Sequence, residues 1–296
     1  MTDPNLPNLT VQQLEYLVAA AASPTRAVAA ASLGVTPSAL TQGLAELERR
    51  IGVTLFERSG RLTRLRPQAA DVLAHARRVV AETRGLARWA EGQRTGRAGV
   101  VRLGTIDAVA VHHRAEAIRR HRQDVPGLDL RLNVAPSGEL LDSLRVGDLD
   151  LVACVEPTRH DLSTQLDGID FDHCFTEPLF AYAPAQSNAE TMADWGPWVS
   201  YPRGSHTREV IAAGLVAAGA PFTVVAESNQ PEVLREMVRL GMGWAVLPAV
   251  PAETGSEPLK RARRRPVAER RIAVARRSGL PADAAVEALA EALLAG

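Results

Sequence analysis

Residues 36–66 constrain the fold of this chain more than any other stretch, because a capped helix is followed there by a short basic hairpin. Thr36 is a favourable N-cap, and Pro37 suits the first helical position, where the missing N–H has no intrahelical partner to lose. Gly52 marks the end of the helix. Apolar residues recur at helical spacing, so one face is expected to pack on a core: Leu40, Leu44, Leu47 and Ile51.

The other face of this helix presents small, hydroxyl or amide side chains, which let a helix approach base edges closely and hydrogen-bond them. An apolar stripe over residues 14–21 and a helix from Thr25 to Leu33 precede it, and Gly34 supplies a tight turn. Residues 56–66 have the pattern of two strands around a Ser-Gly turn, with four arginines suited to phosphates. The pattern predicts a winged helix-turn-helix; the alternative is a three-helix bundle with a solvated polar face.

This interpretation predicts which side chains contact DNA, either at base edges or at phosphates. The candidate DNA-binding residues are Thr36, Ser38, Thr41, Gln42, Arg49, Arg58, Arg61 and Arg64.

Residues 67–94 form a separate helical segment that is rich in Ala and Arg. Small or apolar residues recur in it at alternating spacings of four and three, which is a heptad seam. The seam predicts a dimerisation helix, and the alternative is a helix packed on its own domain. The expected dimer contacts are Leu73, Ala76, Val80, Thr83 and Ala87. Residues 95–99 are expected to be a hinge.

From residue 100 onward, apolar strands alternate with helical segments, which predicts an α/β fold with a parallel sheet. The first unit is expected to have strands at 100–105, 128–134 and 149–155, with helices at 109–122 and 137–146. The second is expected to have strands at 179–183, 198–201, 223–227 and 244–247, with helices at 207–218 and 230–240. A strand at 271–275 and a helix at 282–294 complete the chain.

The charge of the chain is unevenly distributed, although its formal net charge is zero. Residues 1–98 hold 13 arginines and 8 acidic residues, an excess of five positive charges that the remainder balances. The positive end is where DNA is expected to bind. No signal-peptide pattern opens the chain, and no apolar run approaches the ~20 residues of a membrane helix. We therefore expect a cytoplasmic protein without a membrane partner.

The two cysteines and seven histidines indicate neither a disulfide framework nor a metal site. Cys154 falls in a predicted buried strand, where thiols are usually inert, so a redox-sensing pair with Cys174 is the less favoured alternative. The histidines are interpreted as surface or edge residues. Since no paired catalytic carboxylates, phosphate loop or nucleophile elbow occurs, we predict no catalytic residue, no cofactor and no enzyme activity.

Several phrases of the sequence resemble LysR-type transcriptional regulators in order and spacing. In the N-terminal part, over residues 9–94, they are residues 13–17, 35–41, 47–48, 52–58 and 74–78. In the C-terminal part, residues 138–141, 146–151 and 238–248 resemble the periplasmic-binding-protein-like effector domain of the same family. Two departures concern packing: Arg26 stands where the family commonly has Phe, and Gly43 lies inside the predicted recognition helix.

The resemblance implies an α/β multidomain chain. Its parts are a winged helix-turn-helix at 1–66, a linker helix at 67–94 and an effector-binding domain at 100–296. The domain's two subdomains are about 100–175 with 250–296, and about 176–249. It further implies a homodimer joined through antiparallel linker helices, commonly a homotetramer, bound to promoter DNA.

A small-molecule effector is expected at loops that follow the strands, because open α/β sheets bind ligands there. The resemblance places loops 105–108 and 201–207, with Ser137, in a cleft between the subdomains. Hydroxyls and Arg203 suit a small carboxylate, whereas Asp107 suits an amine; alternatively, Ser137 and Thr207 are plain helix caps. The candidate effector-binding residues are Thr105, Asp107, Ser137, Tyr201, Arg203, Ser205, His206 and Asn229.

The predicted function is a ligand-responsive regulator whose DNA-bound state changes when a metabolite occupies the cleft. One alternative is a DNA-binding architectural protein or repressor without an effector. A more remote one is a solute-binding protein or enzyme that carries a vestigial winged helix.

Overall fold

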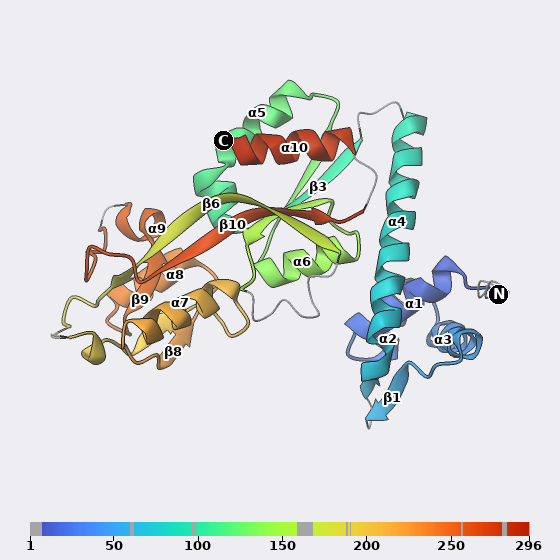
Figure 1. Cartoon of the computed structure of the whole chain (residues 1–296), viewed down its shortest axis with the longest axis horizontal. Helices are drawn as coiled ribbons and strands as arrows, with labels where there is room; N and C mark the ends of the chain where they lie inside the picture. The colour runs from blue at the N-terminus through green and yellow to red at the C-terminus, as the bar shows by residue number, and fades with distance from the viewer. Residues whose placement is uncertain are drawn as a thin grey trace, which may run out of the picture. The chain divides into compact units, whose positions relative to one another are not determined.

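The structure is a computed structural model that describes residues 8–59, 62–95, 99–158, 168–187, 189, 191–255, 257–279 and 283–295. The chain divides into two compact units (Figure 1). The first contains residues 1–97 with 145–148, and the second contains residues 98–144 and 149–296. No helix among the described residues is long and apolar enough to cross a membrane.

The first unit is the winged helix-turn-helix that the sequence predicts. Its elements are α1 (Val11–Ala22), α2 (Arg26–Ser32), α3 (Pro37–Ile51) and the antiparallel hairpin β1 (Phe56–Ser59) and β2 (Leu62–Leu65), here called the wing. Threonine hydroxyls accept the N3 backbone N–H of all three helices, at Thr10, Thr25 and Thr36. Leu17, Leu40, Leu44 and Leu47 are fully buried in its core.

The helix after the wing, α4 (Ala70–Thr95), packs on its own domain over its first three turns. Leu73, Ala76 and Val80 are at most 7% exposed and lie in one apolar core with residues of α1. These three residues therefore do not form an exposed dimer seam, because the face they share is already buried against α1. Thr83 and Ala87, further along the same helix, are exposed.

The second unit is built on a six-stranded sheet with the order β4-β3-β5-β10-β6-β9. The strands are β3 (Val100–Thr105), β4 (Asp129–Val134), β5 (Leu151–Val155), β6 (Ile169–Tyr182), β9 (Ala245–Pro248) and β10 (Ala268–Arg277). The first three pair in parallel, as predicted, whereas β10, β6 and β9 pair antiparallel. A separate parallel pair joins β7 (Trp198–Ser200) and β8 (Val224–Glu227).

Helices cover both faces of the larger sheet (Figure 1). They are α5 (Ala115–Asp124), α6 (Ser137–Arg145), α7 (His206–Ala217), α8 (Pro231–Arg239), α9 (Ala249–Glu253) and α10 (Ala284–Ala295). Helix α10 packs on α5 and on strands β6 and β10, while α6 lies on the other side of the sheet.

Two local features differ from the sequence-based expectation. The predicted helix at 109–122 is two segments, a π-helical turn η2 (Ala108–His113) and α5, separated at Arg114. Strand β6 begins ten residues before the predicted Leu179, because its first part, where polar and apolar residues are mixed, pairs with β10 and packs Ile169, Phe171 and Phe175 on the first core.

Two apolar cores divide the second unit into subdomains. The first contains β3, β5, α6 and α10, and the second contains β7, β9 and parts of α7 and α8. Ala252 and Val267 belong to the second core, so this subdomain extends to about residue 268 rather than ending at 249. Strands β6 and β10 pass from one core to the other.

Candidate functional site

The exposed face of α3 carries the side chains that the sequence assigns to DNA bases. Ser38, Thr41 and Gln42 are all exposed, while the opposite face of the helix is buried. The Thr41 hydroxyl donates to the Pro37 carbonyl at 2.8 Å, which leaves its oxygen free to accept from a base edge. Thr36 is exposed too, but its hydroxyl oxygen caps the helix by accepting the Ala39 N–H.

Arg49, at the C-terminal end of this face, is held by a carboxylate of its own helix. Its guanidinium donates to both oxygens of Glu46, at 2.6 and 2.7 Å, and Arg50 binds the same carboxylate. The two arginine hydrogen bonds lower the pKa of Glu46 to about 2. Since the pair is exposed, a phosphate can replace Glu46 as the partner of Arg49 at little cost.

The wing is attached to the recognition helix through Glu48. Its carboxylate accepts the backbone N–H groups of Leu55 and Phe56, at 2.7 and 3.3 Å, just where the wing begins. Arg64 on the second wing strand is exposed. Arg61 and the side chain of Arg58 lie outside what the structure describes.

Both departures from the family pattern have a packing explanation. Arg26 places its guanidinium over the Phe56 ring, 5.9 Å from the centroid, so it contacts the wing strand. Gly43 faces the Tyr16 ring so closely that a Cβ atom would lie 2.5 Å from Tyr16 Cδ2. Gly43 is therefore required by the α1–α3 contact, whatever its cost in helix propensity.

In the second unit, three of the candidate effector residues lie around the end of β5. Ser137 and His206 are each 8% exposed and contact the two backbone polar groups of one residue, Val155. The Val155 N–H donates to Ser137 Oγ at 3.2 Å, and the Val155 carbonyl lies 3.2 Å from His206 Nδ1. These contacts join the first turns of α6 and α7 to β5. Thr105 is fully buried, and its hydroxyl donates to the Ile106 carbonyl.

A buried ion pair lies beside these loops, where the two crossing strands pass between the cores. Glu177 of β6 and Arg270 of β10 are direct cross-strand neighbours, with 7% and 3% of their side chains exposed. The guanidinium donates to Glu177 Oε2 at 2.6 and 2.7 Å and to Thr207 Oγ1 at 3.0 Å. His113 Nε2 lies 2.7 Å from Glu177 Oε1.

Tyr201 and Asp107 lie near this ion pair. We call the six residues together the polar cluster: Asp107, His113, Glu177, Tyr201, Thr207 and Arg270. The Tyr201 side chain is 5% exposed, and its hydroxyl has no hydrogen-bond partner among the described residues. Burial raises its pKa, against the opposing effect of the nearby Arg270 charge. Burial also raises the pKa of Asp107, which accepts a hydrogen bond from the Ala108 N–H at 2.7 Å.

The pKa of Glu177 moves in the opposite direction. Burial alone raises it, but the hydrogen bond from His113 and the charge and hydrogen bonds of Arg270 outweigh burial, so the pKa is lowered. The Glu177 carboxylate is consequently ionised at neutral pH, so the polar cluster contains the negative charge of Glu177 beside the positive charge of Arg270.

The remaining candidate effector residues are less involved. Arg203 and Asn229 are exposed, and Ser205 is the N-cap residue of α7 without a side-chain hydrogen bond. Sequence reasoning missed the central pair, Glu177 and Arg270, because partners 93 residues apart leave no local spacing signal. It also interpreted the histidines as surface residues, whereas His121 and His206 are buried and His113 binds Glu177.

The two cysteines are separated by a strand. Cys154 on β5 pairs with Ala273 of β10, and Cys174 lies on β6 at the other side of β10. Two strand spacings put their Cα atoms roughly 9–10 Å apart, beyond the about 7 Å that a disulfide spans. Cys154 is fully buried, and burial raises its pKa to about 12. Among the described residues, no three His, Cys, Asp or Glu side chains gather as a metal site.

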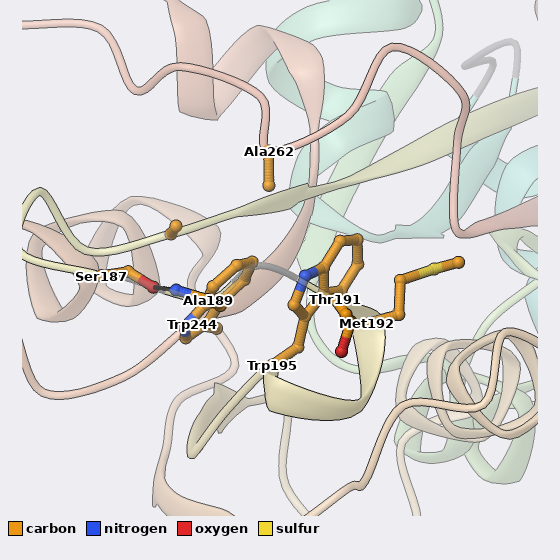
Figure 2. A pocket seen from close by; sticks show the side chains of 8 residues that line it. Ser187, Ala189, Thr191, Met192, Trp195, Trp244 and Ala262 are labelled. Atoms are coloured by element: carbon orange, nitrogen blue, oxygen red, sulfur yellow. Dashed lines mark hydrogen bonds between the residues drawn. The ribbon is translucent and has the colours of Figure 1, made fainter.

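A separate hollow lies in the second subdomain, away from the polar cluster (Figure 2). Its volume is about 280 Å³, and the stacked rings of Trp195 and Trp244, 5.0 Å apart between centroids, form one wall. None of the eight described side chains that line it is charged. It offers an aromatic surface with the hydroxyls of Ser187 and Thr191 at its edge.

Known families match both parts of the chain. Residues 11–70 match the bacterial regulatory helix-turn-helix protein family of lysR type, and residues 94–296 match the LysR substrate binding domain. The chain belongs to the LysR family. It is therefore a transcriptional regulator with a DNA-binding domain and an effector-binding domain.

Individual proteins that are similar to this chain support its assignment to the LysR family. A probable hydrogen peroxide-inducible genes activator of Streptomyces viridosporus is 31% identical over 90% of this chain and 87% of its own length. An uncharacterized transcriptional regulator of Shigella flexneri, YfeR, is 26% identical over 95% and 92%. The solved structure of a full-length OxyR variant from Pseudomonas aeruginosa is 25% identical with a TM-score of 0.62, covering 97% of this chain and 98% of its own. These relatives are regulators rather than enzymes.

Proposed function

We propose that the regulator reads operator DNA with the N-terminal half of α3 and holds the flanking phosphates with its wing. The observation that carries this proposal is the exposed face of α3, where Ser38, Thr41 and Gln42 are exposed together on a helix whose other face is buried. The amide of Gln42 can donate to and accept from one base edge, whereas Arg64 supplies a charge for phosphate. Such a regulator would act in the cytoplasm, where bacterial promoters lie.

Binding measured on selected and random DNA tests this division of roles. Genome fragments enriched by the full-length protein supply the cognate site. Gln42→Ala is expected to weaken cognate binding by roughly 1–3 kcal/mol and to relax the preference at one base position. Arg64→Ala is expected to weaken binding to all sequences alike and to reduce the salt slope by about one. Equal losses on cognate and random DNA for both variants would refute base reading by Gln42.

We infer that the regulator dimerises through the exposed face of α4 rather than through the buried seam. Leu86 lies on this face and is 64% exposed although apolar, whereas Val79, seven residues earlier, packs partly against the core of its own domain. Thr83, three residues before Leu86, is exposed on the same face. A dimer of this kind would place its two recognition helices about 34 Å apart, which is one turn of DNA, or a whole-number multiple of that distance. Two dimers would then form the tetramer that the family resemblance implies.

Light scattering of full-length variants tests this surface. Leu86→Glu is expected to dissociate the dimer and leave the fold intact, because it adds a charge to an exposed face. Ala74→Glu is the matched control, since Ala74 is exposed on a different face of the same helix. A Leu86→Glu protein that stays dimeric would exclude this face. Val80→Arg would not test dimerisation, because it buries a charge in the core of the domain.

We further propose that a small-molecule effector binds at the polar cluster and shifts the population of DNA-bound states. The support is the placement of the polar cluster on the strands that join the two cores, with first-turn residues of α6 and α7 beside it. A ligand that prefers one arrangement of the two subdomains changes the equilibrium by its differential affinity. A regulator without an effector is the alternative, and ligands that raise the melting temperature in a saturable way would exclude it.

A further inference from the structure

Two carboxylates, Asp107 of the polar cluster and Glu232 beside it, lack a permanently cationic partner of their own among the described residues. Arg270 is already engaged by Glu177 and Thr207. Asp107 accepts the N–H of its neighbour Ala108, and no described arginine or lysine forms an ion pair with it. Glu232, in the first turn of α8, has His112 Nε2 at 3.6 Å, a partner that is charged only when protonated.

These carboxylates belong to one electrostatic environment. Asp107 interacts with Glu232, His112 and Arg270, and burial disfavours its charged form, which raises its pKa. The charges of Arg270 and Glu177 cancel each other. Asp107 and Glu232 therefore leave this region with a net negative charge when both are ionised. A partly buried carboxylate without a cationic partner is disfavoured in its charged form, and a cation that binds it offsets that cost.

An unsatisfied hydroxyl points to the same place. Tyr201 Oη is buried and unpartnered among the described residues, and it lies within electrostatic reach of Asp107, Glu177, Glu232 and Arg270. Since buried polar groups are almost always hydrogen-bonded, this hydroxyl is expected to gain its partner from a bound molecule. A phenol oxygen accepts from N–H donors, as the carboxylates do.

We propose that the effector of this regulator carries a cationic nitrogen, an ammonium or a guanidinium, that binds between Asp107 and Glu232 and donates to Tyr201 Oη. The inference rests on the proposed effector function of the polar cluster and adds the chemical class of the ligand. A small dicarboxylate is disfavoured, because it would bring like charge to two carboxylates.

Thermal unfolding of the full-length protein with a defined panel tests the class. The panel contains putrescine, agmatine and lysine as cations, succinate and glutarate as anions, and butanediol as a neutral probe. We expect saturable stabilisation by at least one cation and none by the anions or the diol. Asp107→Asn is expected to weaken that binding by about tenfold or more, the effect of losing one charge-assisted hydrogen bond. Asp129→Asn, the same change on the exposed edge strand β4, is expected to have no effect.

Two further measurements keep the result decisive if Asp107→Asn folds poorly. Glu232→Gln changes a half-exposed side chain, with 51% of its surface exposed, and is also expected to weaken cation binding. Calorimetric titration of Glu232→Gln with the stabilising cation is expected to show the same loss of affinity as thermal unfolding does. Stabilisation by anions alone would overturn the cationic class and keep effector binding. No stabilisation by any probe, with DNA binding intact, would overturn both.

Discussion

Gly43 lies inside the recognition helix with the ring of Tyr16 against it, and replacing it with alanine tests whether this contact holds α1 and α3 together. Helix propensity alone favours alanine by about 1 kcal/mol. The structure predicts that alanine lowers the stability of the domain instead, because the new Cβ would lie 2.5 Å from Tyr16 Cδ2 and 2.6 Å from Tyr16 Cε2. Tyr16 is 7% exposed, and its hydroxyl accepts from Gln12 Nε2 at 3.0 Å, so the ring is not free to move aside.

The expected magnitude follows from the two opposing effects. Overpacking a dense core costs about 1–3 kcal/mol, and the severity of this overlap places Gly43→Ala near the upper end. After the gain in propensity, the domain should lose about 2 kcal/mol. In a Tyr16→Ala background the ring is absent, so the same substitution should stabilise the domain by about 1 kcal/mol. The coupling between the two sites is therefore about 3 kcal/mol.

Native-state hydrogen exchange of the full-length protein is the suitable assay, because it reports the opening of one domain in a chain of several. Amides of α1 and α3 should exchange about tenfold faster for each 1.4 kcal/mol lost. Exchange in the second unit serves as the internal control. If Gly43→Ala has the same effect with and without the Tyr16 ring, the packing explanation is wrong.

The remaining predictions concern the wing, the ion pair and the thiols. Glu48→Ala should loosen the wing, because two backbone N–H groups lose their acceptor, and protection of the wing amides should fall by about 1–3 kcal/mol. The pKa of Glu177 is lowered in the folded protein, so the stability it contributes is present above its ordinary pKa and is lost as the pH falls through the folded value. The acid-induced loss of stability in this range should therefore be smaller in Glu177→Gln than in the unsubstituted protein. That variant should itself be less stable by about 3–5 kcal/mol, since it leaves Arg270 as a buried charge without a counterion. Peroxide treatment of the folded protein should form no disulfide between Cys154 and Cys174, as measured by non-reducing mass analysis; such a bond would contradict the strand order.

Local signals account for the parts of the fold that the sequence predicts well. Each N-cap threonine acts on a backbone N–H three residues away, and each apolar stripe repeats within a few turns, so neither depends on distant residues. The parallel strands of the first subdomain follow from the same kind of signal. Strand β6 was predicted only in part, because its first half mixes polar and apolar residues and pairs with β10, about a hundred residues later in the chain.

The sequence alone predicts that residues 67–94 form a helix with an apolar stripe, that residues 37–51 expose a polar helix face, and which family the chain resembles. Only the tertiary structure decided which partner buries the stripe, because periodicity specifies a buried face and not the surface that covers it; Leu73 and Val80 pack on α1. It alone also decided the centre of the polar cluster. Glu177 and Arg270 become neighbours through strand register, and register is set by pairing across the sheet rather than by residues adjacent in sequence.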